Sequence, residues 1–179
     1  GPDTRNDLPA TYAADVFSTI LNLRTSALQK ALVESGLAFN VNVNYQTCKF
    51  TGPIQIFMVP NPARIKEAIK VLQDEIKKWD RDDYFTDEQL STAKSQLEIS
   101  DAFGKEQTSN FVHTVTYWWA SASIGYYTNY NENVHKVTRE EIKSYVRKYI
   151  QNQPSAWGVL VDPKSKESMQ LDESIFVQK

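Results

Sequence analysis

The residues best suited to metal or nucleophilic chemistry are few and scattered in this 179-residue chain. It has two histidines, His113 and His135, and one cysteine, Cys48. A catalytic zinc ion usually takes three protein ligands and keeps one position open for water. Neither histidine has a second histidine at helical spacing, so we expect both to be ordinary polar positions near helix ends. Cys48 lies in a strand pattern and reads as a buried structural thiol. The sequence therefore predicts no metal site within the chain.

Two further sets of residues also lack the spacing that catalysis needs. Three serines have no paired histidine or acid at a recognisable distance in the sequence, so nucleophilic catalysis has no support: Ser109, Ser121 and Ser123. Three aspartates lack the Asp-x-Asp-x-Asp-Gly order of a calcium loop and predict a solvated turn: Asp80, Asp82 and Asp83. We therefore predict no catalytic residue in this chain.

Composition predicts one folded domain without a strong electrostatic preference. The 20 basic and 22 acidic residues are well mixed and give a net charge of −2. This balance does not favour nucleic acid or a membrane surface as a partner. Hydrophobic residues make up 41% of the chain, enough for a real core, and no apolar run approaches the roughly 18 residues of a membrane span. We expect the domain over residues 1–162 and a polar tail over residues 163–179.

The ends of the chain are consistent with more than one cellular compartment. Gly1-Pro2 could be native or a remnant of a cleaved tag, and the chain opens almost directly into a helix, as an excised fragment would. A signal peptide would then lie outside the sequence, so periplasm and cytoplasm both stay possible.

The first elements that would position a site are a helix and a hairpin. Asp7-Leu-Pro9 predicts a helix start, and apolar residues at helical spacing continue to Leu32, after which Gly36 ends the helix. From Ala38 to Phe50 the pattern is that of a half-buried strand. Its apolar positions alternate with asparagines: Phe39, Val41, Val43 and Tyr45 against Asn40, Asn42 and Asn44. The residues from Ile54 to Val59 predict a second, antiparallel strand.

The rest of the chain predicts helices and one closing strand. Asn61-Pro62 starts a helix, and capping boxes at Thr86 and Thr138 start two more. Ala156 to Val161 predicts a last strand. The fold class is therefore α+β, a two-layer sandwich with a mostly antiparallel sheet covered by helices.

Three blocks of residues resemble the insulinase/pitrilysin-type zinc metallopeptidases. The block from Thr25 to Phe39 matches the pattern of their second, non-catalytic domain at four positions: Gln29, Gly36, Leu37 and Ala38. The block from Thr86 to Lys94 and the block from Val137 to Ile150 resemble two later helices, in family order. The resemblance covers about residues 10–162 and implies one half-module of the family fold. The family domain begins with an extra strand before its first helix, and no strand pattern precedes Asp7 here. The resemblance therefore implies that the sheet lacks its first strand and exposes an unpaired edge.

The resemblance also implies that the chemistry is supplied elsewhere. Family members that cleave peptides often carry an arginine and a tyrosine, seven positions apart, that bind substrate. Those positions are Leu32 and Phe39 here, which cannot donate the corresponding hydrogen bonds. The inverted His-x-x-Glu-His zinc motif of the family is absent too. We expect zinc in a partner catalytic domain and no cofactor in this chain.

An aromatic cluster is the remaining candidate site. Four of its members are candidates for a contact surface: Tyr117, Trp118, Trp119 and Tyr126. The cluster could form a wall for peptide side chains or a contact with a partner domain. The alternative is ordinary core packing followed by a tyrosine-rich turn. The adjacent Trp118 and Trp119 cannot both face inward on one helix, so we expect at least one to be partly exposed.

Together these observations predict a non-catalytic domain of a zinc metallopeptidase. It would help a catalytic metallopeptidase domain or subunit to enclose and bind a peptide substrate, and would be inactive alone. The alternative is a degenerate structural or assembly subunit of the same fold with no peptidase role, which Leu32 and Phe39 favour slightly. An unrelated two-layer binding domain is a third, more remote hypothesis.

Overall fold

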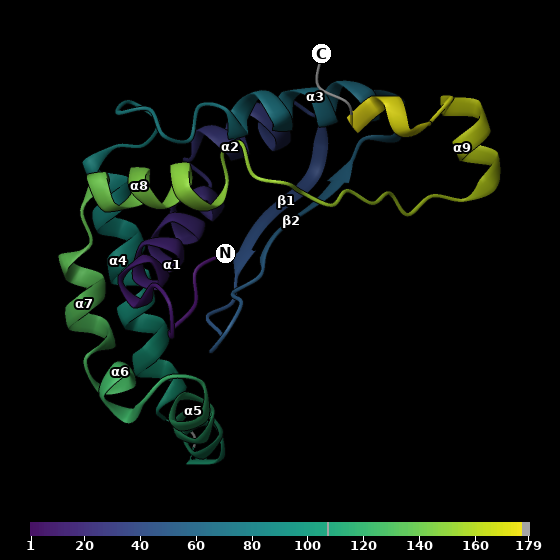
Figure 1. Cartoon of the computed structure of the whole chain (residues 1–179). Helices are drawn as coiled ribbons and strands as arrows, with labels where there is room; N and C mark the ends of the chain where they lie inside the picture. Colours follow the sequence, from purple (N-terminus) through teal and green to yellow (C-terminus); the bar gives the residue numbers. More distant parts are fainter. Residues whose placement is uncertain (107, 177–179) are drawn as a thin grey trace.

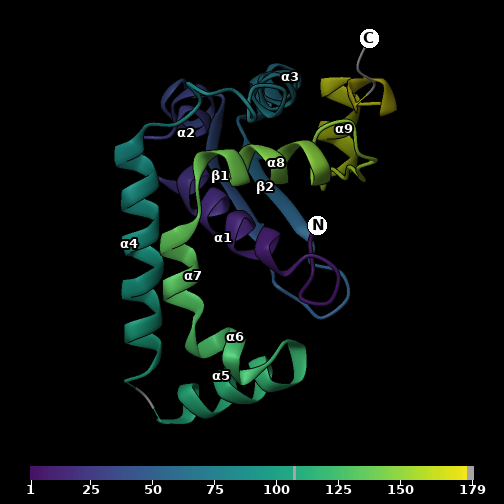
Figure 2. The same ribbon diagram turned by 60° about the vertical axis from the view of Figure 1, so that its left-hand side comes forward.

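The computed structural model describes residues 1–106 and 108–176, and it has the predicted α+β architecture. Figures 1 and 2 show a two-stranded sheet beside a group of helices, with α1 (Leu8–Asn22) next to β1 (Ala38–Tyr45). Residues 1–6 form a turn before α1 rather than a strand, held by a backbone bond from Thr4 N to Cys48 O. Because β1 packs against α1 and the apolar side chains of both strands join the core, the helices cover one face of the sheet.

Helix α1 begins at the predicted place but is anchored differently from the expectation. Pro9 occupies its first turn, and its apolar face is fully buried. The side chain of Asp7 does not cap the helix. Its carboxylate instead accepts bonds from Lys148 Nζ at 2.5 Å and from the Tyr149 hydroxyl at 2.7 Å. Asp7 thus joins the start of α1 to the end of α8 (Arg139–Tyr149). Its carboxylate bonds to Lys148 and Tyr149 instead of to the free backbone N–H groups in the first turn of α1.

A short irregular helix leads from α1 into the sheet. Ser26 caps α2 (Ala27–Gln29) by accepting a bond from Gln29 N, and the π-helical turn η1 (Lys30–Glu34) follows. Gly36 then has φ +73°, a conformation in which a β-carbon would be strained. The predicted glycine stop is therefore confirmed.

The predicted hairpin is present, with one irregularity. Strand β1 pairs antiparallel with β2 (Ile54–Pro60), and β1 ends at Tyr45 rather than Phe50. The register shifts between Ala38 and Asn40, which leaves Phe39 as an extra, bulged residue. Phe39 is consequently 68% exposed, so the expectation that it shares the buried face of β1 is wrong.

The remaining helices agree with the predicted starts. Thr86 and Thr138 both form complete capping boxes, at the starts of α4 and α8. The other elements between the hairpin and α8 are η2 (Pro62–Arg64), α3 (Ile65–Ile76), α4 (Asp87–Gly104), α5 (Thr108–Ser121), α6 (Ile124–Thr128) and α7 (Tyr130–Lys136). Figure 2 shows α4 and α7 running side by side, with α5 and α6 at their far end.

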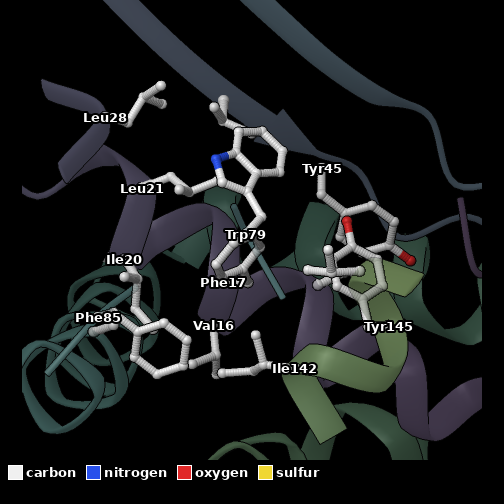
Figure 3. Packing of buried hydrophobic residues seen from close by; sticks show 14 of the residues in the cluster. Val16, Phe17, Ile20, Leu21, Leu28, Tyr45, Trp79, Phe85, Ile142 and Tyr145 are labelled. Carbon is white, nitrogen blue, oxygen red and sulfur yellow. The ribbon is translucent and has the colours of Figure 1, made fainter. Parts of the chain in front are cut away.

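The core is organised around Trp79, which is completely buried (Figure 3). The ring of Phe17 meets its indole edge-on, with centroids 5.5 Å apart. Trp79 Nε1 donates to the Tyr84 hydroxyl at 3.0 Å, and that hydroxyl donates to Glu75 Oε2 at 2.9 Å. The buried indole is therefore satisfied by a short relay of hydrogen bonds, as a buried donor must be.

The predicted closing strand is wrong. Residues Ala156 to Val161 form neither helix nor strand, no described residue pairs with them in a sheet, and Leu160 is fully exposed. Apolar alternation predicts only that a segment suits a strand, and the strand forms only where a neighbouring edge lies in register. The segment leads to α9 (Pro163–Met169) and η3 (Glu173–Phe176), and Leu171 is buried against Ile65 and Ile69 of α3.

Candidate functional site

The two positions at which the family often carries arginine and tyrosine do not face the same way. Leu32 lies in η1 with its side chain completely buried in the core. Phe39 lies on the bulge of β1 and points into solvent. The structure therefore does not bring the pair together at one surface. Neither side chain has a hydrogen-bonding group to offer a substrate.

The bare face of the sheet is the most open surface near these positions. Three cross-strand pairs lie on it in register: Asn40 with Val59, Asn42 with Phe57, and Asn44 with Gln55. Phe57 is 62% exposed, and the adjacent bulge adds Phe39. Amide groups thus alternate with apolar side chains on a surface that no described element covers.

One edge of this sheet is closed by side chains. Asn22 Nδ2 donates to Val43 O at 2.7 Å, and Val43 N donates to Asn22 Oδ1 at 2.9 Å. Gln29 Nε2 donates to Val41 O at 2.9 Å. These amides take the place of a third strand along β1. Gln29 is one of the family matches found in the sequence, but nothing in the pattern indicated this contact.

The other edge of the sheet is open. Ile56 lies opposite Val43 in the register. Because the N–H and C=O of Val43 point away from β2, those of Ile56 point away from β1, as antiparallel geometry requires. The sheet has two strands, so no other strand among the described residues uses this edge of β2. The open edge expected from the sequence is therefore on β2.

The four aromatic candidates do not form one surface. Tyr126 is buried and stacks on Tyr12 with centroids 5.0 Å apart, and the Tyr117 hydroxyl donates to Thr47 O. Trp118 is half-buried, with its ring 4.9 Å from that of Tyr126. Trp119 points outward and is 72% exposed, whereas Tyr117 is 38% exposed although its hydroxyl is bonded. The expectation that one tryptophan is exposed is confirmed, and the other three rings attach α5 and α6 to the core.

A largely buried carboxyl group, that of Asp15, lies close to these rings. The Tyr130 hydroxyl donates to Asp15 Oδ2 at 2.8 Å. Burial raises the pKa of Asp15 to about 7, and the bond from Tyr130 opposes that rise only in part. Burial together with Asp15 also raises the pKa of Tyr130, which keeps its hydroxyl protonated as the donor. Sequence reasoning missed Asp15 because a single acid on an apolar helix carries no motif.

The two candidate histidine ligands lie on different helices, and two of the candidate acids form ion pairs. His113 lies in the middle of α5, not near its end as expected, and His135 Nε2 lies 3.1 Å from Glu98 Oε2 on the surface. Asp80 and Asp82 are not merely solvated, because they pair with Arg147 and Lys143 of α8.

Two kinds of site, a cluster of metal-ligating side chains and a membrane-spanning helix, can be assessed for the described residues. Within residues 1–106 and 108–176, no three histidine, cysteine, aspartate or glutamate side chains gather closely enough to hold a metal ion. A catalytic zinc therefore does not fit the residues described. Among the same residues, no helix has the length and apolar character to cross a membrane.

Fold and surface together define an α+β domain in which helices cover one face of a two-stranded sheet. Over residues 1–97, more than half of the chain, the sequence matches the family described as the peptidase M16 inactive domain. The chain belongs to this family, the insulinase-type family that the three sequence blocks resemble.

Comparison with individual proteins supports the fold but does not identify a function. No curated protein sequence matches the chain. Among solved structures, the chain is similar to a protease from Helicobacter pylori, with a TM-score of 0.65 and 18% identity. The match covers 84% of this chain and 37% of that one, so the chain spans little more than a third of that protease. At this level of identity the likeness shows a shared fold.

Proposed function

We propose that this chain is the non-catalytic domain of a zinc metallopeptidase, which encloses and binds a peptide substrate together with a catalytic M16 partner. Its membership in a family of inactive peptidase domains supports this role. The observation that carries the proposal is the bare sheet face, on which Phe57 and Phe39 stand exposed beside a row of asparagines. A monomeric soluble domain rarely leaves such apolar groups together without a partner.

The sheet face suits a peptide because it offers two kinds of contact. The amides of Asn40 and Asn42 can both donate to and accept from a peptide backbone. The rings of Phe57 and Phe39 can cover apolar side chains of the peptide. Each contact is available without moving the core, since the opposite face of the same strands is packed against α1.

In this proposal the partner carries the zinc ion and the general base, and this chain contributes binding and exclusion of water. Enclosure strengthens electrostatic interactions at the partner's reacting atoms by lowering the local dielectric. Holding the peptide in one orientation lowers the entropic part of the barrier. Neither effect requires a catalytic side chain from this chain.

The test reconstitutes the two halves. The chain is mixed with the zinc-bearing M16 domain that is encoded beside it or upstream in the same reading frame, and cleavage of a fluorogenic peptide is measured. We expect no cleavage by the chain alone and cleavage by the mixture. If the zinc-bearing domain cleaves equally well without the chain, the proposal is wrong.

A matched pair of variants tests the sheet face itself. Phe57→Ser changes an exposed ring on the bare face, while Phe103→Ser changes an equally exposed ring on α4, 66% exposed. We expect Phe57→Ser to raise the KM of the mixture several-fold and Phe103→Ser to leave it unchanged. Equal effects of the two variants would remove the sheet face from the proposal.

A structural or assembly subunit of the same fold is the second candidate function. The burial of Leu32 favours it, because the position at which the family often binds substrate serves the core here. In that case the chain would be required for assembly of its complex, and Phe57→Ser would weaken that assembly. Peptide cleavage would be absent even with every neighbouring subunit present.

A further inference from the structure

A small cavity of about 250 Å³ lies where α4, α5, α6 and α7 meet. Three aromatic side chains line it, Trp118, Tyr127 and Tyr130, together with one carboxylate, Asp101. Its volume is below the usual range for a drug-sized ligand, roughly 300–1,000 Å³, and suits a single side chain. Most of the lining is apolar, so the carboxylate is the group that would select what enters.

The chain already places a cation at the rim of this cavity. Lys105 Nζ donates to Asp101 Oδ2 at 2.6 Å and lies 5.4 Å from the centre of the Tyr127 ring. A carboxylate and an aromatic face are the two groups that attract an ammonium ion. The bond to Asp101 raises the pKa of Lys105. The Lys105 side chain is 44% exposed, so water can reach this cation and another can compete with it.

A buried amide beside Asp101 has an unused acceptor. Asn131 Nδ2 donates to Asp101 Oδ2 at 2.8 Å, which fixes the orientation of the amide, since the reverse orientation would set two oxygens against each other. Asn131 Oδ1 is buried and has no hydrogen-bond partner within the described residues. Such an acceptor is costly to leave unpaired. Asn131 is not itself among the residues that line the cavity, so its role there is to hold the carboxylate of Asp101 in place at the cavity wall.

We propose that this cavity binds the side chain of a lysine in a peptide, with its ammonium group between Asp101 and the aromatic rings. The aliphatic stem of the lysine would lie against Trp118 and Tyr130, in the manner of long charged side chains on apolar surfaces. The incoming ammonium displaces that of Lys105, which occupies the rim in the absence of a ligand. The inference does not depend on the proposed function, since its test needs neither a partner nor peptide cleavage.

The test titrates the whole chain with Nα-acetyl-lysine N-methylamide and follows the tryptophan indole N–H signals by NMR. We expect the Trp118 signal to shift in a saturable way. The neighbouring Trp119, which is exposed, and the buried Trp79 serve as internal controls and should stay in place. The norleucine analogue has a similar stem and no ammonium group, and it should bind at least tenfold more weakly.

Three variants locate the binding. Asp101→Asn should abolish the Trp118 shift, while Lys105→Met should tighten binding by up to about fivefold, since an exposed ion pair is worth at most about 1 kcal/mol. Lys136→Met is the matched control, because Lys136 forms the same i, i+4 pair with Glu132 on an open surface, and should change nothing.

Several outcomes would overturn the inference. Equal binding of the norleucine analogue would make the cavity a purely apolar subsite. Tighter binding of the corresponding arginine analogue would assign it to a guanidinium group. An unchanged Trp118 shift in folded Asp101→Asn, or a uniform shift of all indole signals, would remove the cavity as the binding site.

Discussion

The buried carboxyl group of Asp15 makes the stability of this domain depend on pH in an unusual direction. Burial raises the pKa of Asp15 from 3.8 to about 7. The neighbours that interact with it electrostatically include Tyr12, Tyr126 and Tyr130, and the Tyr130 hydroxyl donates a hydrogen bond to its carboxylate. The folded state therefore retains a proton that the unfolded chain loses near pH 4. Stability is full below about pH 4 and falls as the pH rises towards 7.

The size of the effect follows from the shift. Each unit of pKa corresponds to about 1.4 kcal/mol, so a shift of about three units amounts to roughly 4 kcal/mol over the whole range. About 3 kcal/mol of this falls between pH 4.5 and pH 8. Asp3 and Asp7, whose pKa values are lowered in the folded state, contribute stability that is lost only below about pH 4, outside that window.

The perturbation is Asp15→Asn, which keeps an acceptor for the Tyr130 hydroxyl and removes the titration. Urea unfolding at half-unit steps from pH 4.5 to pH 8 gives the free energy of unfolding for each protein. We expect the wild type to lose stability across this range and the variant to show little of that slope. Asp74→Asn, on the exposed side of α3, is the control and should keep the wild-type slope. Identical slopes for wild type and Asp15→Asn would refute the reasoning.

Three further predictions concern the buried core, the edge of β1 and the metal content. Leu32→Arg, which restores the family residue, should destabilise the chain by about 3–5 kcal/mol in urea unfolding, because a charged group would be buried without a partner, whereas Phe39→Tyr should change stability by less than about 0.5 kcal/mol. Asn22→Ala should cost about 2–4 kcal/mol and promote self-association in ultracentrifugation, because both polar backbone groups of Val43 lose their partner. Dialysis against EDTA should leave the Tm unchanged in differential scanning calorimetry, and a drop of several degrees would reveal a structural metal ion.

The parts of the fold that were predictable are those with local signals. The capping boxes at Thr86 and Thr138 and the stop at Gly36 depend on residues within one turn, and each is present. The hairpin depends on alternation within two short segments and is also present. Local patterns succeed here because the tertiary structure agrees with them.

Most of the errors involve contacts between residues that are distant in the sequence. The bulge at Phe39 inserts one residue into a regular alternation, and period-two patterning cannot reveal it. Asp7 was expected to cap its own helix and pairs instead with Lys148, which is 141 residues away in the sequence. The segment from Ala156 to Val161 has the composition of a strand but lies on no edge.

The candidate site was predictable only in part. The sequence located the positions of Leu32 and Phe39, but their opposite orientations follow from the π-helical turn and the bulge. The cavity near Trp118 is lined by Asp101 of α4 and Tyr130 of α7, which come from two helices and share no spacing in the sequence. Sites built from several helices leave no linear pattern, whereas helix caps do.

The amides of Asn22 and Gln29 occupy the outer edge of β1, so a further strand can be added to the sheet only along β2. A strand from another molecule can join along β2, but the far side of β1 is already occupied by these side chains. Two copies that met through β2 would form a four-stranded sheet with a blocked edge at each end. Assembly by this route stops at two molecules, so the fold can accept one added strand without acting as a template for a fibre.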